Sequence, residues 1–225
     1  MKILTTILIL FSNFLFSQNI KEIDSVAQNW CKEIETSTKE NSSQEILKKS
    51  FEKIVLPYVE NYDDSLKEGI FTKIFYRIQR LGCKKFYELN SDIEPESGSM
   101  KRPNKIPETK ITNRYLKLFK DSNYFSYMEN NGSITKVILD QNNWTSYFSD
   151  GTFSKYKLHW INYNEFEIIY IDSDNEARKN MNIVGDKYNY RIIDYSESAQ
   201  SFTLIEYIPS VPKFAEFELK LDKKN

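Results

Sequence analysis

Phe153-Ser-Lys-Tyr-Lys-Leu-His-Trp-Ile161 is the stretch that decides the fold class of this chain. Large apolar side chains alternate in it with basic ones, Tyr156, Leu158 and Trp160 against Lys155, Lys157 and His159. Successive side chains of a strand point to opposite faces, so a period of two gives one apolar and one polar face. The stretch therefore predicts a strand of an antiparallel sheet that is buried on one side and wetted on the other.

Three further stretches repeat this period. Their apolar positions are Phe166, Ile168, Tyr170, Tyr188, Tyr190, Ile192, Ala215, Phe217, Leu219 and Leu221. Turn-forming pairs separate the runs, at Asn131-Gly132, Asp150-Gly151 and Gly185-Asp186. After Ile111 we count about eight short strands, a number and order that suit an up-and-down barrel or a strongly curved sheet. Only residues 174–182 interrupt the strands, and we expect them to form a short helix or a lid.

The chain before this region has helical spacing. Apolar side chains recur every three or four residues at Ile20, Ile23, Ala27, Trp30, Cys31 and Ile34, and again at Leu66, Ile70, Ile74, Ile78 and Leu81. Between them, Ser42 and Glu45 form a capping box that starts another helix, which Pro57 should stop or kink. Residues 58–62 could add a fourth helix. The predicted fold class is α+β: a small N-terminal helical domain followed by an antiparallel up-and-down β-barrel or curved sheet.

The N-terminal sequence has the pattern of a secretory signal peptide. Lys2 precedes an apolar run from Ile3 to Phe16, and a polar segment follows Ser17. The run is shorter than the 18–20 apolar residues, roughly, that a membrane span needs. We therefore expect cleavage near Ser17/Gln18 and export to the periplasm or the cell exterior, with no transmembrane segment left after cleavage.

Proline and glycine mark the boundary between the two halves. Pro95, Gly98, Pro103 and Pro107 lie in a stretch with almost no large apolar residues. The expected organisation is a signal peptide over 1–17, a helical domain over 18–90, a linker over 91–110 and an antiparallel β-domain over 111–225.

Cys31 and Cys83 are the only cysteines, and both belong to the helical half. In an oxidising compartment such a pair is most often a disulfide. It would close a loop of roughly 50 residues and, by the chain-entropy estimate, stabilise the folded state by about 4 kcal/mol. Two free buried thiols are the alternative.

The β-half resembles a known type of domain. The pattern Ser154-Lys-Tyr-Lys-Leu-His-Trp-Ile161, then Glu165-Phe-Glu-Ile-Ile-Tyr170, then Gly185-Asp-Lys-Tyr-Asn-Tyr190 is similar to the small lipocalin-like (calycin-type) barrel domains of uncharacterised bacterial exported proteins. The resemblance covers roughly residues 112–222 and implies a β-barrel. The Gly-x-Trp signature of lipocalins is absent near residues 124–129, and no ligand residues carry over.

Composition and motifs argue against several function classes. The 31 basic and 32 acidic residues nearly balance, which leaves no basic footprint for nucleic acid. No phosphate loop, dinucleotide fingerprint or zinc-protease motif occurs, so we expect no cofactor and no metal. The single histidine, His159, falls on the polar face of its strand. Glu165 and Glu167 could form a carboxylate pair for hydrolysis, although both should lie on a solvated face.

The inward aromatic residues are the candidate site. They are Tyr156, Trp160, Phe166, Tyr170, Tyr188, Tyr190 and Phe217. In an eight-stranded barrel they line either a packed core or a cavity for one small ligand. The leading hypothesis is a non-enzymatic exported protein whose β-domain binds a small apolar or amphipathic ligand. The alternative is a protein-interaction or envelope-associated protein with a solid β-core, its partner unknown, and the third is a carboxylate-based hydrolase.

Overall fold

The computed structural model describes residues 20–37, 42–91, 103, 105–129, 131–140, 142–209 and 214–222. The chain divides into two compact units, residues 1–93 and 94–225, and the division falls inside the segment predicted as a linker. The predicted signal peptide and its cleavage site lie outside the described residues, as does most of the predicted linker.

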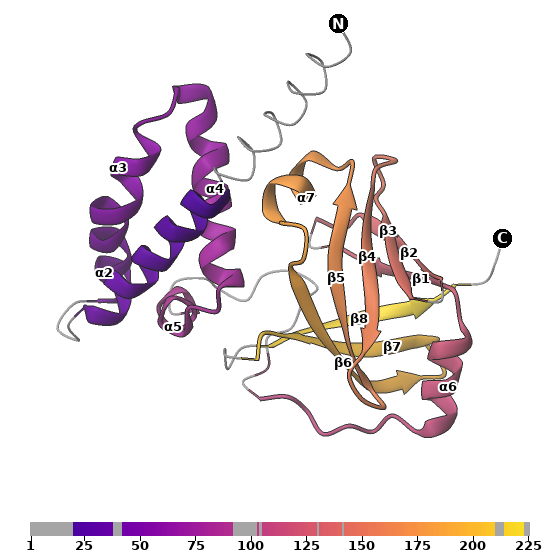
Figure 1. Ribbon diagram of the computed structural model, residues 1–225. Helices are drawn as coiled ribbons and strands as arrows, with labels where there is room; N and C mark the ends of the chain where they lie inside the picture. The colour runs from indigo at the N-terminus through magenta and orange to yellow at the C-terminus, as the bar shows by residue number, and fades with distance from the viewer. Residues whose placement is uncertain are drawn as a thin grey trace, which may run out of the picture. The chain divides into compact units, whose positions relative to one another are not determined.

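The first unit is helical (Figure 1). A helix over residues 20–36 is followed by α2 (Ser43–Ser50), a π-helical turn η1 (Phe51–Val55), α3 (Leu56–Val59), α4 (Asp64–Arg80) and α5 (Lys84–Ser91). The predicted capping at Ser42 is confirmed, because its side chain accepts the backbone N–H of Glu45 at 3.3 Å.

Pro57 does not stop the second helix. The chain passes through η1 into α3, and the backbone N–H of Leu56 reaches the carbonyl of Phe51 in the wider π-helical register. In a regular α-helix the ring of Pro57 would clash with the carbonyl of Lys53. The π-turn widens the helix just before Pro57, and the chain continues into α3.

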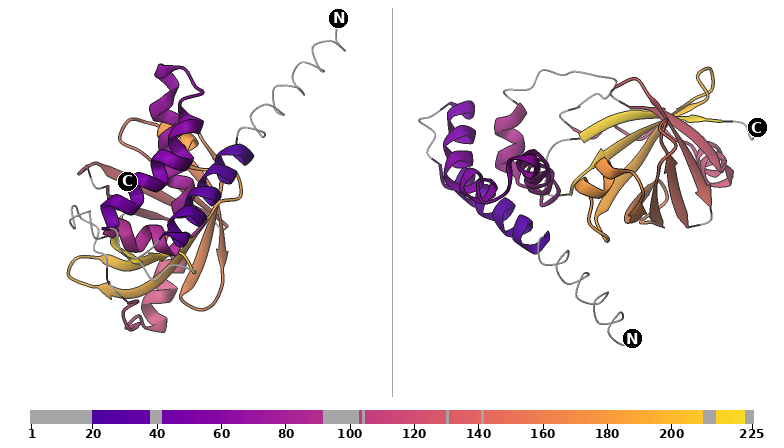
Figure 2. Two further views of the ribbon diagram at one scale, coloured as in Figure 1. Left: turned by 90° about the vertical axis from the view of Figure 1, so that its left-hand side faces the viewer. Right: turned by 90° about the horizontal axis from the view of Figure 1, so that it is seen from above.

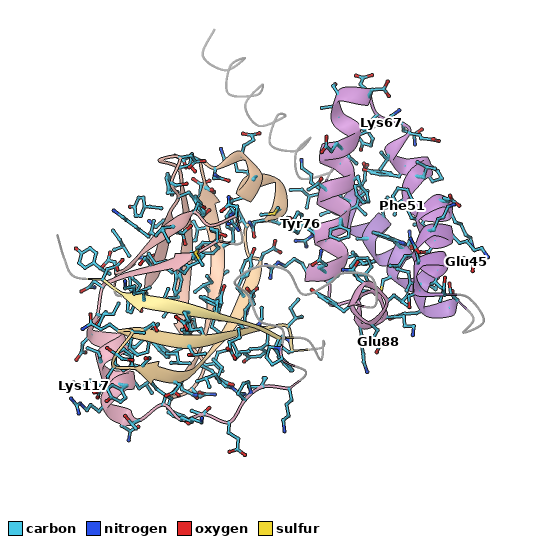
Figure 3. The ribbon with its side chains drawn as sticks, turned by 180° about the vertical axis from the view of Figure 1, so that it is seen from behind. Glu45, Phe51, Lys67, Tyr76, Glu88 and Lys117 are labelled. Carbon is cyan, nitrogen blue, oxygen red and sulfur yellow. A yellow bond between two sulfur atoms is a disulfide. The ribbon has the colours of Figure 1, made fainter. Side chains whose placement is uncertain are left out.

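The core of the helical unit is aromatic and is tied by one disulfide. Trp30 packs edge-on against Phe51 and Phe86, with ring centroids 6.1 and 5.4 Å apart, and its indole N–H donates to Ser50 Oγ at 2.9 Å. Figure 3 shows Phe51 among these helices. The predicted disulfide is present: the Sγ atoms of Cys31 and Cys83 lie 2.03 Å apart, across 52 residues of sequence.

The second unit is a closed antiparallel barrel. Its strands are β1 (Tyr124–Met128), β2 (Ile134–Asp140), β3 (Asn143–Tyr147), β4 (Phe153–Trp160), β5 (Glu165–Ser173), β6 (Lys187–Ser196), β7 (Ser201–Tyr207) and β8 (Phe214–Leu221). Each strand pairs with the next in sequence, and β8 returns to β1. This confirms the predicted α+β class with an up-and-down sheet, and of the two expected forms the sheet takes the barrel.

The register places the predicted inner faces together. Tyr156 pairs with Tyr170, and Trp160 pairs with Phe166, across β4 and β5. Bulges at Lys155/Tyr156 and between Ile192 and Asp194 shift the register in two places and help the sheet to curve. Gly132, Gly151 and Gly185 have positive φ in the turns where the sequence predicted them.

Two helices flank the barrel at opposite ends (Figures 1 and 2). The first, α6 (Asn113–Asp121), was not among the predicted elements, because the sequence after Ile111 was read as strands alone. Its start is set by Thr112, whose side chain accepts the backbone N–H of Tyr115, and it buries Leu116 and Phe119. The second, α7 (Glu176–Met181), confirms the predicted short helix in the segment 174–182.

Candidate functional site: the α7 end of the barrel

The interior of the barrel changes character along its axis. We call the part beside α6 the α6 end; its inward side chains are Phe119, Phe125, Trp160, Phe166 and Phe202. We call the part beside α7 the α7 end; its inward side chains are Tyr127, Thr135, Tyr156, Tyr170, Tyr188 and Glu206. The inward side chains of the α7 end thus carry hydroxyl and carboxylate groups, whereas phenylalanine and tryptophan rings dominate the α6 end, where Tyr195 also packs against Phe202.

An arginine–glutamate pair is the centre of the α7 end. Glu129 directly follows β1, and its Oε1 accepts three hydrogen bonds. The donors are Tyr127 Oη at 3.1 Å, Thr135 Oγ1 at 2.9 Å and Arg178 Nη2 at 2.9 Å. The first two donors belong to the barrel wall and the third to α7, so the carboxylate is fixed by the wall and is then bridged to the helix.

The guanidinium of Arg178 lies among aromatic rings. Its Cζ is 4.9 Å from the centre of the Phe148 ring, in cation–π geometry. Burial alone would lower the pKa of Arg178, but the carboxylate of Glu129 and the hydroxyl groups of Tyr127, Tyr156 and Tyr188 together raise this pKa above its ordinary value. The surroundings of the guanidinium therefore favour a positive charge.

Polar contacts hold α7 in place. Asn175 caps the helix by accepting the Arg178 backbone N–H at 3.0 Å, and its own Nδ2 donates to Thr152 Oγ1 at 2.8 Å. At the other end Tyr188 donates to the side chain of Asn182. Among the described side chains of α7 none is buried. A six-residue helix without a fully buried apolar side chain is marginal by itself, so little free energy holds it in this position.

The tyrosines of the α7 end have raised pKa values. Burial raises the pKa of Tyr170 to about 12, with a further contribution from Tyr156. Burial and the nearby Glu129 also raise the pKa of Tyr127, and burial with Glu206 raises the pKa of Tyr190, which lies between the two ends. These hydroxyl groups are neutral hydrogen-bonding groups at physiological pH and cannot serve as bases there.

The structure brings all seven predicted aromatic residues into one core cluster. Trp160 and Phe166 lie at the α6 end against Phe119, with ring centroids 6.0 and 5.8 Å from it. Tyr190 and Phe217 lie between the ends, 5.8 Å apart. Tyr156, Tyr170 and Tyr188 belong to the α7 end. The candidates are thus divided between two environments, and only the last three lie beside the arginine–glutamate pair.

The sequence did not point to Glu129, Arg178, Tyr127 or Thr135. Glu129 and Arg178 are 49 residues apart and meet only because β1 and the β5–β6 connection open at the same end of the ring. One signal was present: Arg178 belongs to the only segment that interrupts the strands, which was expected to form a helix or a lid.

The proposed carboxylate pair has a different environment from the expected one. Glu165 was expected on a solvated face, but it is buried, because Arg191 and Asn162 both donate to its carboxylate. Glu167 contacts Lys187 Nζ at 3.1 Å and His159 Nδ1 at 3.4 Å. His159 is exposed, as expected.

Among the described residues, one group of three side chains of kinds that can bind a metal ion lies close together: Cys31, Glu35 and Cys83. The two cysteines of this group are bonded to each other in the disulfide.

A groove of about 640 Å³ lies on the outer face of the barrel over β1 and β2. Its walls include Tyr124, Ile134, Ile138 and Tyr147. Ile134 and Tyr147 are 50% and 43% exposed, and the neighbouring Met128 is 52% exposed. Exposed apolar side chains thus gather on this face, which is a feature of interaction surfaces.

Comparisons with protein-family models, curated proteins and solved structures gave no match to this chain. In the described part of the chain, no helix has the length and apolar character needed to cross a membrane.

Proposed function

We propose that this protein is an exported, non-enzymatic binding module that takes a small amphipathic ligand at the α7 end of its barrel. The observation that carries the proposal is the polar Glu129–Arg178 pair at one end of an interior made largely of aromatic and aliphatic side chains, under a helix that buries no described side chain. Ligand sites are mostly apolar and contain a few polar groups that fix orientation. The α7 end has that composition.

Export is supported by two features. The apolar run from Ile3 to Phe16 has the form of a signal peptide, and the Cys31–Cys83 disulfide fits an oxidising compartment.

We further propose that the β-domain is lipocalin-like. The closed eight-stranded ring supports this assignment through its architecture, since barrels of that size can hold one small ligand.

Two tyrosines, one inside the barrel and one outside, allow a direct test. The probe is N-phenyl-1-naphthylamine, a neutral apolar dye whose fluorescence rises on binding. We expect wild-type protein to bind the dye, Tyr188→Ala to weaken binding by roughly ten-fold as one desolvated contact is lost, and Tyr147→Ala to leave it unchanged. Normal dye binding by both variants would contradict the proposal.

The outer groove favours a second candidate function, a protein-interaction module with a solid barrel. It rests on the exposed apolar side chains of Ile134, Met128 and Tyr147. In the same dye titration, weaker binding with Tyr147→Ala and normal binding with Tyr188→Ala would favour this candidate over the first.

A further inference from the structure

We propose that the polar group of the ligand is an organic cation, an ammonium or guanidinium on an apolar body, and that Arg178 occupies its position in the closed barrel. This inference rests on the proposed function of the α7 end. It names the chemical class of the ligand and assigns α7 as the element that the ligand displaces.

The wall of the α7 end is built for a positive charge. Glu129 presents a carboxylate that the wall residues Tyr127 and Thr135 hold in place. Glu206 pairs with Tyr190 across β6 and β7, and since antiparallel partners share a face, it is a second carboxylate on the inner side. Among the described residues, Arg178 is the one cation that hydrogen-bonds Glu129.

Aromatic rings complete the site. Phe148 lies under the guanidinium at 4.9 Å, and the side chains of Tyr156 and Tyr188 pack against each other nearby, with ring centroids 5.9 Å apart. Ring faces beside a carboxylate form the arrangement that binds organic cations in proteins, because the negative face of each ring attracts the charge. The same rings would contact the apolar body of the ligand.

Arg178 is the partner that can leave. It is carried by α7, which buries none of its described side chains, whereas Glu129 is tied to the wall by two hydroxyl donors. A ligand cation that replaced Arg178 would restore the charge balance at Glu129. An anionic ligand would instead have to enter beside Glu129 and Glu206 with both carboxylates still present.

Three ring compounds of matched size test the inference: benzylammonium, benzyl alcohol and benzoate. Binding to the full chain is measured by calorimetry with wild type, Arg178→Ala, Arg178→Ala/Glu129→Gln and Lys187→Ala. The last variant removes a cation that pairs with Glu167 on the outer face and so controls for the change in net charge. Hydrogen exchange of the α7 amides in wild type gives a second readout that needs no variant.

We expect benzylammonium to bind Arg178→Ala at least about ten-fold more tightly than wild type, because a tethered competitor at millimolar effective concentration has been removed. The double variant should lose this binding, and Lys187→Ala should behave as wild type. In wild type, benzylammonium should accelerate exchange of the α7 amides as the helix is displaced.

Other results would overturn the inference in distinguishable ways. Tighter binding of benzoate, or equal binding of benzyl alcohol in every variant, would refute the cation class and leave the ligand-binding function standing. Absence of binding by all three compounds would refute the cation class alone if the naphthylamine dye still binds in a Tyr188-dependent way. It would refute the proposed function as well if that dye also fails.

Discussion

The two ends of the barrel are closed by short helices, α6 of nine residues and α7 of six, that differ in how they are held. At the α6 end, Phe119 is fully buried, and its ring lies 5.0 to 6.0 Å from those of Phe125, Trp160, Phe166 and Phe202. At the α7 end, the helix is attached through Asn175, Arg178 and Asn182, all by hydrogen bonds or charge. One helix therefore belongs to the hydrophobic core, and the other rests on a polar cluster.

The strand pairing follows the same asymmetry. β1 and β8 close the ring through Phe125 with Leu221 and Ser126 with Lys220, which are pairs of the α6 half. In the described part of the chain, Tyr127 and Met128 pair only with β2. Polar contacts can be exchanged for those of a ligand at little net cost, whereas buried apolar area cannot. The comparison indicates that the α6 end supplies stability and that the α7 end can open.

The largest effect should come from the α6 end. Phe119→Ala removes a ring with four aromatic neighbours and should lower the free energy of unfolding by about 3–5 kcal/mol, as buried phenylalanines do. Urea unfolding followed by circular dichroism measures this. Lys117, an exposed residue of α6 that Figure 3 labels, provides the control Lys117→Ala, which should change little. A small effect of Phe119→Ala would mean that α6 is not part of the core.

A smaller effect is expected at the α7 end. Arg178→Ala leaves Glu129 without its cation, and since both side chains are partly exposed, at 30% and 23%, the loss should be about 1–2 kcal/mol, between the values for exposed and buried pairs. Arg178→Lys keeps the charge and should recover part of the loss. If Arg178→Ala unfolds the protein as readily as Phe119→Ala does, the two ends are not different in kind.

The two helix caps give a matched pair of substitutions. Thr112 caps α6 and Asn175 caps α7, each by accepting a backbone N–H with its side chain. Replacement by alanine typically costs about 1 kcal/mol. We expect Thr112→Ala to lower the global free energy of unfolding by that amount. Asn175→Ala should mainly increase hydrogen exchange within α7, and a global loss of the same size would contradict the comparison.

Alkaline pH should weaken the α7 end. The pKa of Tyr170 rises from 10.0 to about 12 in the folded protein, so the folded state holds this proton more tightly than the unfolded state does. Its stabilising contribution is complete below about pH 10 and is lost as the pH rises through about 12. Tyr170→Phe should therefore flatten the fall of stability in this range. An unchanged pH profile would show that Tyr170 does not contribute.

Strands and turns could be predicted from the sequence because each leaves a local pattern, and the disulfide could be predicted because Cys31 and Cys83 are the only cysteines. The alternation in β4 and the turn at Asn131-Gly132 need no knowledge of distant residues. α6 was missed because a nine-residue helix inside an aromatic-rich segment leaves a short signal. The burial of Glu165 depends on Arg191, which is 26 residues away, and the Glu129–Arg178 pair depends on ring closure. Such contacts are set by topology and leave no mark on neighbouring sequence.

Hydrogen exchange of the native protein, compared between the amides of α6 and α7, tests the central claim most directly. If the α6 end is part of the core and the α7 end opens by itself, α7 amides should exchange at least about a hundred-fold faster than those of α6, at a rate nearly independent of low urea concentrations. Exchange of both helices at the same rate, with the urea dependence of global unfolding, would contradict the claim that one end of this barrel opens while the other stays closed.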